Sequence, residues 1–268
     1  MTVRHYDASY RDFSSDLYAA IRREAFDEDI GQNSWLTADE HDLLIGWMAP
    51  GRDSRVLDVA CGSGHTTLRI ASRTGCAVHG IDIHAGAMAE ARAAAGRASL
   101  AGRAEFTEHD ASRPLPFAGG SFDSVICIDA INHLPDRQAV LAEWARVLAP
   151  GGILVFTDPI VVTGPLTAEE IAIRSSIGFF LFVPPGTDER LLDGAGFDVT
   201  DAVDRTDNMA VIARRRREAR ARHEEDLRRI EGDATYVGQQ RFLEVASRLA
   251  AERRLSRLAF RAVRRQGG

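Results

Sequence analysis

The sequence of 268 residues predicts an α/β fold built on a doubly wound sheet of seven strands. Five short apolar runs alternate with segments of helical periodicity, near residues 55–60, 76–82, 103–108, 122–129 and 152–158. Strands that alternate with helices form a parallel sheet with helices on both faces. Residues 197–205 and the alternating segment 255–264 predict the sixth and the seventh strand. A chain of this length can bury one substantial core.

Two helices are predicted ahead of the first strand. Residues 10–27 place apolar side chains at helical spacing, namely Phe13, Leu17, Ala20, Ile21 and Ala25. A polar turn follows over residues 31–34. Thr37 then precedes Glu40 by three residues, the signature of a capping box, which predicts a second helix that ends near Met48. We assign residues 1–50 to an N-terminal helical segment and residues 51–268 to the sheet domain.

Composition and charge exclude several kinds of partner. The net charge is −6 and the pI is near 5.8, so the chain lacks the basic surface that nucleic-acid binding requires. No run in the sequence approaches the roughly 20 apolar residues of a membrane span. The first residues contain no apolar core of a secretory signal. We therefore expect neither nucleic acid nor a membrane as a partner.

The three cysteines, Cys61, Cys76 and Cys127, fall in or beside predicted strands. An odd number of buried cysteines argues against a disulfide framework and fits a reducing compartment. No spacing of cysteine and histidine indicates a zinc site. We expect a cytoplasmic protein with no metal centre.

The stretch VLDVACGSGH, residues 56–65, is the most informative part of the chain. Gly62 and Gly64 allow a sharp turn between strand and helix, and a close approach of a ligand to the backbone. Asp82 follows about 20 residues later, where an acid at a strand end can accept hydrogen bonds from ribose hydroxyls. The third glycine of a dinucleotide-binding turn is absent, and Asp58 would repel a pyrophosphate. The stretch therefore predicts a nucleoside-containing cofactor that places a positive charge near Asp58.

The same stretch resembles motif I of the class I S-adenosylmethionine-dependent methyltransferases, in the form D-x-A-C-G-x-G. Four further motifs of that family follow in order at residues 80–83, 108–111, 121–127 and 146–152, so the resemblance covers roughly residues 50–205. It implies a Rossmann-like mixed sheet whose last strand is antiparallel, and S-adenosylmethionine as the cofactor. The cofactor-binding residues that it implies in the sheet domain are Asp58, Ala60, Gly62, Gly64, Asp82, Ile83, Asp110, Ala111 and Ile128.

Within this resemblance, Asp82 binds the ribose, Ile83 lies against the adenine face and Asp110 accepts from the adenine amino group. Each residue also has a purely structural interpretation. The two glycines can simply close the turn, Asp82 can cap the next helix, and Asp110 can shape its loop. Five motifs in the family's order favour the cofactor interpretation over separate structural ones.

After the fourth predicted strand, the sequence CIDAINHL of residues 127–134 is similar to the corresponding turn of phosphoethanolamine and related small-amine methyltransferases. The resemblance implies that Asp129 and His133 position and deprotonate the methyl acceptor. We assign the base to His133, while Asp129 orients His133 or contacts the cofactor. The alternative for His133 is a role in packing alone.

The same resemblance implies that the N-terminal segment is a helical lid over the site. A tyrosine of this segment closes the site, and of Tyr10 and Tyr18 we select Tyr18. Gln32 and Ser34 lie on the turn that meets the amino acid end of the cofactor.

Two later segments bear on the acceptor. Residues 161–185 are apolar, and their run Phe179–Val183 predicts either a wall of the acceptor pocket or packing in the core or between subunits. Residues 208–251 predict a helical insert that Gly232 and Gly238 divide into two helices. The charged run Arg214–Arg217 predicts a solvated helix face.

We therefore expect a methyltransferase that modifies an N, O or C atom of a small, partly apolar molecule, such as a natural-product intermediate. The alternative is an enzyme of the same fold that binds S-adenosylmethionine without methylating, such as a cyclase, because fold alone does not fix function. The sequence leaves the oligomeric state open, a homodimer included.

Overall fold

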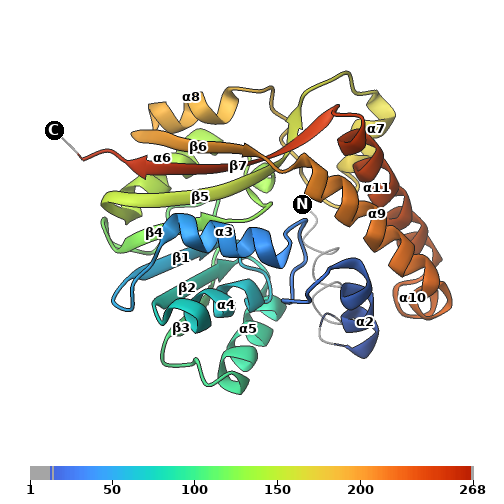
Figure 1. Cartoon of the computed structure of the whole chain (residues 1–268), viewed down its shortest axis with the longest axis horizontal. Helices are drawn as coiled ribbons and strands as arrows, with labels where there is room; N and C mark the ends of the chain where they lie inside the picture. The colour runs from blue at the N-terminus through green and yellow to red at the C-terminus, as the bar shows by residue number, and fades with distance from the viewer. Residues whose placement is uncertain (1–12, 14, 267–268) are drawn as a thin grey trace.

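The computed structural model describes Phe13 and residues 15–266. Its strands are β1 (Arg55–Val59), β2 (Ala77–Asp82), β3 (Ala104–Glu108), β4 (Phe122–Cys127), β5 (Leu148–Val162), β6 (Phe197–Asp204) and β7 (Leu255–Arg264). They form one sheet with the order β3-β2-β1-β4-β5-β7-β6 (Figure 1). β1 to β5 are parallel, whereas β7 is antiparallel to both β5 and β6. The predicted mixed seven-stranded sheet is confirmed.

The helices lie between the strands and at one end of the sheet (Figure 1). They are α2 (Asp16–Ala25), α3 (Ala38–Met48), α4 (His65–Thr74), α5 (Ala85–Arg97), α6 (Arg137–Val147), α7 (Ala168–Arg174), α8 (Thr187–Gly194), α9 (Thr206–Arg222), α10 (Glu224–Glu231), α11 (Asp233–Ala251) and the short 3₁₀ helix η1 (Ile131–His133). In the part of the chain that the structure describes, we find no helix with the length and apolar character of a membrane span.

Helices cover both faces of the sheet because successive side chains of a strand point to opposite faces. Leu57 of β1 joins one core cluster with Trp144 of α6. Its neighbour Val56 joins another with Leu44 of α3 and Met88 of α5. The two clusters make the sheet doubly wound, as predicted.

Two predicted element boundaries are wrong. β5 is longer than residues 152–158, because its ends are also paired: Leu148 lies beside Phe122 of β4, and Val162 beside Leu255 of β7. The insert consists of three helices rather than two, since it breaks near His223 and at Gly232, while Gly238 lies inside α11. A single glycine in a helix interior destabilises it by only about 1 kcal/mol relative to alanine, which packing outweighs.

Thr37 begins α3 as predicted, and its hydroxyl accepts the backbone N–H of Glu40 at 3.2 Å. The Glu40 side chain, however, does not return to Thr37 to complete a capping box. Its carboxylate lies 2.6 Å from the guanidinium of Arg257 in β7. The Glu40 carboxylate, which the sequence pattern assigned to the helix cap, therefore forms an ion pair with a buried arginine instead.

The two N-terminal helices pack in different places. α3 lies on the sheet, where Leu44 belongs to the core cluster named above. α2 instead packs against the insert, at the end of the sheet where α9, α10 and α11 gather (Figure 1). Ile21 and Ala25 of α2 share a cluster with Trp35, Met209 and Phe242. This arrangement places α2 and the insert together over one end of the sheet.

Candidate active site

The turn after β1 adopts left-handed backbone conformations at Ala60 (φ 58°), Gly62 (φ 55°) and Gly64 (φ 74°). This region favours glycine, so Ala60 holds a strained conformation. A Cβ on Gly64 would lie 2.6 Å from the ring of Phe106 and 2.8 Å from Ala91. The missing side chain at Gly64 thus lets the turn pack closely against α5 and β3.

A cavity of about 490 Å³ lies at the ends of the strands, beneath α2 and the insert. Pockets of this size hold small molecules and cofactors. Of the eleven predicted cofactor-binding residues, ten line it and Gly64 does not. The ten are Gln32, Ser34, Asp58, Ala60, Gly62, Asp82, Ile83, Asp110, Ala111 and Ile128. The predicted catalytic residues Tyr18, Asp129 and His133 line the same cavity.

Asp82 connects the end of β2 to the glycine turn. One carboxylate oxygen accepts the N–H of Gly62 at 2.9 Å, and the other accepts the N–H of His84 at 3.0 Å. Burial raises the pKa of this carboxyl, and the two backbone donors oppose that shift. Each carboxylate oxygen can accept a second hydrogen bond. Asp82 can therefore fix the turn and still bind a ligand hydroxyl.

Asp58 is a buried acid at the end of β1 that lines the cavity. The hydroxyl of Thr67 donates to it at 2.5 Å. Burial raises its pKa to about 7, and the nearby negative charge of Asp82 adds to the shift. A ligand cation placed beside Asp58 would offset this penalty. The two acids at the strand ends thus fit a ligand that carries both hydroxyls and a positive charge.

Asp110 and Ile83 line the part of the cavity beyond β2 and β3. Asp110 accepts from the backbone N–H and the hydroxyl of Ser112, at 2.9 and 2.6 Å. Partial burial opposes ionisation of Asp110, but these bonds and the charge of Arg113 leave its pKa below the usual value. Ile83 is 44% exposed. An exposed apolar side chain and a charged acceptor in the same cavity fit a flat heterocycle with an amino group.

The turn between α2 and α3 holds its shape through its own polar groups. The Gln32 amide accepts from Ile30 N–H at 2.8 Å and donates to the Glu28 carbonyl at 3.0 Å. The Ser34 hydroxyl accepts from Leu36 N–H at 3.2 Å. Both predicted residues line the cavity, and Gln32 also stabilises the turn.

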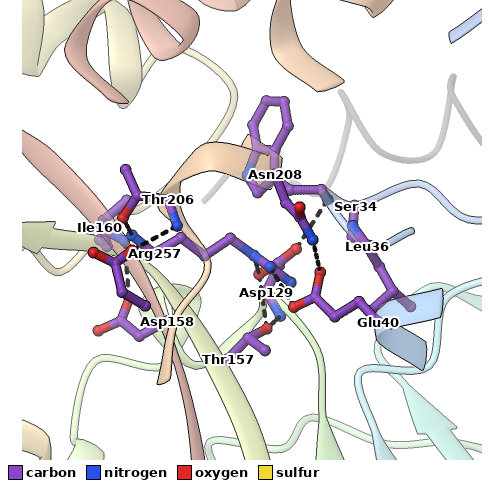
Figure 2. Close-up of polar contacts among 12 residues, drawn as sticks. Ser34, Leu36, Glu40, Asp129, Thr157, Asp158, Ile160, Thr206, Asn208 and Arg257 are labelled. Atoms are coloured by element: carbon purple, nitrogen blue, oxygen red, sulfur yellow. Dashed lines mark hydrogen bonds and ion pairs between the residues drawn. The ribbon is translucent and has the colours of Figure 1, made fainter. Parts of the chain in front are cut away.

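Asp129 is at the centre of a buried polar network, shown in Figure 2. One of its oxygens accepts from the Thr157 hydroxyl and from Nε of Arg257, both at 2.7 Å. The other accepts the backbone N–H of Trp35 at 2.9 Å. Arg257 also binds Glu40 at 2.6 Å. Through these partners, Asp129 fixes the turn before α3.

His133 lies on η1, and its Nδ1 is 2.8 Å from the backbone carbonyl of Phe179. A carbonyl only accepts, so Nδ1 carries the proton and the lone pair of the neutral ring lies on Nε2. Burial lowers the pKa of His133 from 6.5. The carbonyl of Phe179, and not Asp129, is the hydrogen-bond partner of Nδ1, so an orienting role of Asp129 stays a prediction. The ring is instead held in place by Phe180, whose centroid lies 4.7 Å away.

Tyr18 connects α2 to the insert. Its hydroxyl donates to a carboxylate oxygen of Glu231 at the end of α10. The same carboxylate binds Arg220 of α9 at 2.6 Å. The contact brings the two covering elements together at the cavity, as a lid residue would. Tyr10, the other candidate, lies outside the described residues.

Sequence reasoning missed several residues of the cavity, among them Asn132, Arg174, Arg216, Arg220 and Phe242. The charged run at 214–217 is not a uniformly solvated face, since Arg216 faces the cavity and lies 5.5 Å from the ring of Trp35. Helical spacing from the buried Met209, through Ala213 and Arg216 to Arg220, was the signal that could have found this inner face.

The cavity shows no metal chemistry in the residues described. Among them, no group of three or more histidine, cysteine, aspartate or glutamate side chains could hold an ion. The three cysteines are free and buried. Carboxylates, guanidinium groups, amides, hydroxyls and the imidazoles of His84, His109 and His133 are therefore the side-chain groups that the cavity offers for binding and proton transfer.

Comparisons with known proteins point to one family. Residues 56–152 match the family described as "Methyltransferase domain". The chain is 31% identical over 163 residues to O-methyltransferase rstn1 of Aspergillus nomiae, a match over 60% of this chain and 72% of that protein. It is 34% identical to O-methyltransferase cnsE of Penicillium expansum, over 60% of this chain and 58% of the relative. It is 32% identical to 27-O-demethylrifamycin SV methyltransferase of Amycolatopsis mediterranei, over 59% of this chain and 61% of that protein. The chain thus spans less than two thirds of the last two relatives.

Solved structures show the same fold. The [4+2]-cyclase SpnF aligns with a TM-score of 0.79 at 22% identity, over 98% of this chain and 96% of that one. Phosphoethanolamine N-methyltransferase 2 of Haemonchus contortus aligns with a TM-score of 0.80 at 22% identity, over 98% of this chain and 61% of that one. At such low identity, these matches establish the architecture alone.

Proposed function

The chain belongs to the class I S-adenosylmethionine-dependent methyltransferases, and we propose that it transfers a methyl group to a small, partly apolar molecule. An N, O or C atom can accept a methyl group in this family. The names of the O-methyltransferase relatives favour oxygen, and with it a natural-product intermediate as acceptor. The buried free cysteines favour a reducing compartment such as the cytoplasm.

The observation that carries this proposal is the pair of acids at the ends of β1 and β2. Asp58 and Asp82 flank the turn that contains Gly62, and all three line one cavity with His133. When bound, S-adenosylmethionine supplies a methyl group on a positively charged sulfur. Asp82 would hold the ribose, and Asp58 would lie toward the positively charged amino acid end.

The remaining cofactor contacts follow from the same cavity. Asp110 would accept from the adenine amino group while Ile83 covers the ring face. Backbone at Ala60, Gly62, Ala111 and Ile128, together with Gln32 and Ser34, would complete the binding surface. Gly64 has only an indirect part, since it shapes the turn.

His133 would accept the proton that an acceptor hydroxyl or ammonium loses. Burial keeps its ring neutral near pH 7, and the Phe179 carbonyl leaves Nε2 as the basic nitrogen. Asp129 would act through position, because it fixes the turn that contains Ser34 and Trp35. Tyr18 would close the site by joining α2 to Glu231, which excludes water from the reacting groups.

The first experiment is calorimetric titration of the purified protein with S-adenosylmethionine, S-adenosylhomocysteine and NAD. We expect micromolar binding of the two sulfur compounds and no binding of NAD. Acceptors are then screened by the release of S-adenosylhomocysteine. Release in step with product supports methyl transfer, whereas product without release supports the non-methylating alternative. Binding of NAD alone would overturn the proposal.

A further inference from the structure

Asn132 is a buried amide whose polar atoms lack partners. The residue lies on η1 directly before His133, is 1% exposed and lines the cavity. Its backbone carbonyl accepts the N–H of Leu181 at 2.8 Å, which fixes the residue against the apolar segment. In contrast, neither Oδ1 nor Nδ2 of its side chain has a hydrogen-bond partner among the described residues.

An unpaired buried amide destabilises a folded protein, and native structures contain few of them. Gln32 provides the comparison within the same cavity, because both ends of its amide are bonded to the backbone. The Gln32 amide is therefore explained by the fold, and the Asn132 amide is not. A ligand that completes its hydrogen bonds would account for it.

The neighbourhood of Asn132 indicates what kind of ligand this is. Phe179 and Phe180 precede Leu181, and both line the cavity with Ile177 and Phe242. Phe180 lies between His133 and Phe242, with ring centroids 4.7 and 6.5 Å away. These aromatic walls suit an apolar, ring-bearing body. The polar groups of the cavity near them include the guanidinium of Arg174, 4.3 Å from the Phe242 centroid, the imidazole of His133 and the amide of Asn132.

We propose that Asn132 is a specificity-determining residue that binds a second oxygen-bearing group of the acceptor, adjacent to the oxygen that is methylated. The inference rests on the proposed methyl transfer and names its substrate class, a ring compound with neighbouring oxygens. An amide donates through Nδ2 and accepts through Oδ1, so a hydroxyl can bind at either end. Asn132 and His133 lie on the same short helix η1 and line the same cavity, so one acceptor can contact both residues.

The test uses two probes, a naphthalenediol with adjacent hydroxyls and the corresponding mono-hydroxyl naphthol. Wild-type enzyme is expected to methylate the diol with the higher kcat/KM. Asn132→Leu is expected to lower kcat/KM for the diol by about tenfold, mainly through KM, as one lost hydrogen bond would. Its kcat/KM for the naphthol and its affinity for S-adenosylhomocysteine should change less than about twofold.

Thermal melting separates this role from a structural one. Asn132→Leu is expected to keep or raise the melting temperature, since no hydrogen bond within the protein is lost. The matched variant Gln32→Leu should lower it, because its backbone partners become unpaired. Asn132→Ala provides a smaller side chain if leucine prevents folding.

The outcomes are distinguishable. Equal losses for the diol and the naphthol in Asn132→Leu, or a fall in melting temperature like that of Gln32→Leu, would overturn the specificity role. Binding of S-adenosylhomocysteine without turnover of either probe would overturn the acceptor class and leave cofactor binding intact. Absence of S-adenosylhomocysteine binding would instead overturn the proposed function itself.

Discussion

The carboxylate of Asp129 accepts the backbone N–H of Trp35 at 2.9 Å, across a sequence separation of 94 residues. This bond ties the turn before α3 to the end of β4, so two walls of the cavity are set relative to each other. The same carboxylate is bound by Arg257, which also binds Glu40. The shape of the site thus depends on the ion pairs of Arg257 with Asp129 and Glu40.

Loss of the Arg257 side chain should strongly destabilise the protein. In Arg257→Met, Asp129 and Glu40 become buried acids without a cation, and the free energy of unfolding should fall by about 3–5 kcal/mol. Chemical denaturation measures the change. Arg214→Ala is the control, because its pair with Glu218 is exposed and should contribute less than about 0.5 kcal/mol. Equal, small changes in both variants would contradict a stabilising network.

Cofactor affinity should increase with pH through the ionisation of Asp58. Its pKa of about 7 leaves part of this carboxyl protonated at neutral pH, and only the ionised form attracts a ligand ammonium. S-adenosylhomocysteine should therefore bind more tightly at about pH 8 than at about pH 6. Asp58→Asn should bind more weakly and lose this pH dependence. Calorimetry at the two pH values measures the affinities. If Asp58→Asn keeps the pH dependence of the wild-type affinity, Asp58 does not bind the ligand ammonium.

The same carboxyl should make the protein without ligand less stable as pH rises. The folded state retains a proton up to about pH 7, whereas the unfolded chain loses it near 3.8. Stability from this group is thus present at low pH and is lost between about pH 4 and about pH 7. The melting temperature of Asp58→Asn relative to wild type should increase across that range. Burial also raises the pKa of Asp188, so the Asp58 contribution is measured by the difference in melting temperature between Asp58→Asn and wild type.

Replacement of His133 by alanine should lower kcat/KM by about a hundredfold if the imidazole is the base. The base is active when neutral, and burial lowers its pKa from 6.5. Wild-type activity should therefore persist below pH 6.5 and fall only as His133 protonates, and that acid limb should disappear in His133→Ala. His79→Ala is the matched control, since burial also lowers the pKa of His79. If kcat/KM falls only a few-fold in His133→Ala, His133 is not the base and contributes to packing alone.

Asp82→Ala should weaken binding of S-adenosylhomocysteine by about 1–3 kcal/mol, through lost hydrogen bonds to the ribose. Asp82→Asn keeps one acceptor oxygen, so its affinity for S-adenosylhomocysteine should fall less than that of Asp82→Ala. Calorimetry supplies the affinities, and melting curves show whether the glycine turn survives without its carboxylate. Glu105→Ala, an exposed acid on the neighbouring strand, should bind like wild type. Unchanged affinity in Asp82→Ala would contradict the proposal that Asp82 binds the ribose.

Tyr18→Phe should speed the release of S-adenosylhomocysteine by about fivefold, because α2 loses one hydrogen bond to Glu231. Stopped-flow displacement measures the rate. Tyr236→Phe is the control: this tyrosine is buried in the insert and accepts from Gln240 at 3.3 Å. If both variants release the ligand at the wild-type rate, the Tyr18 hydroxyl does not hold the lid closed.

The sequence predicted the sheet well because its signals are local. Residues such as Val56 and Leu57 alternate between two faces, and the Gly62 turn has few other conformations. The same locality explains why Asp58 and Asp82 could be placed at one cavity: both lie at the carboxyl ends of buried strands. Their chemical roles stay predictions that the experiments above test.

What the sequence could not supply depends on contacts between distant segments. Glu40 matched a capping pattern, yet Arg257 binds it from β7. Arg216 looked like part of a charged surface, and only the position of α9 over the cavity turns it inward. Asn132 gave no signal at all, because a missing hydrogen-bond partner is visible only when all neighbours are in place.

The ion pair between Glu40 and Arg257 spans 217 residues, which gives the molecule an order of assembly. On the ribosome, α3 and the first five strands emerge long before β7. Asp129 and Glu40 therefore have no ion-pair partner until Arg257 has been synthesised. Contacts of such long range form late because loop closure opposes them. We expect a nascent chain that ends before β7 to collapse around the first strands with the turn at Trp35 unfixed. Completion of the cavity would then be the last step of biosynthesis rather than an early one.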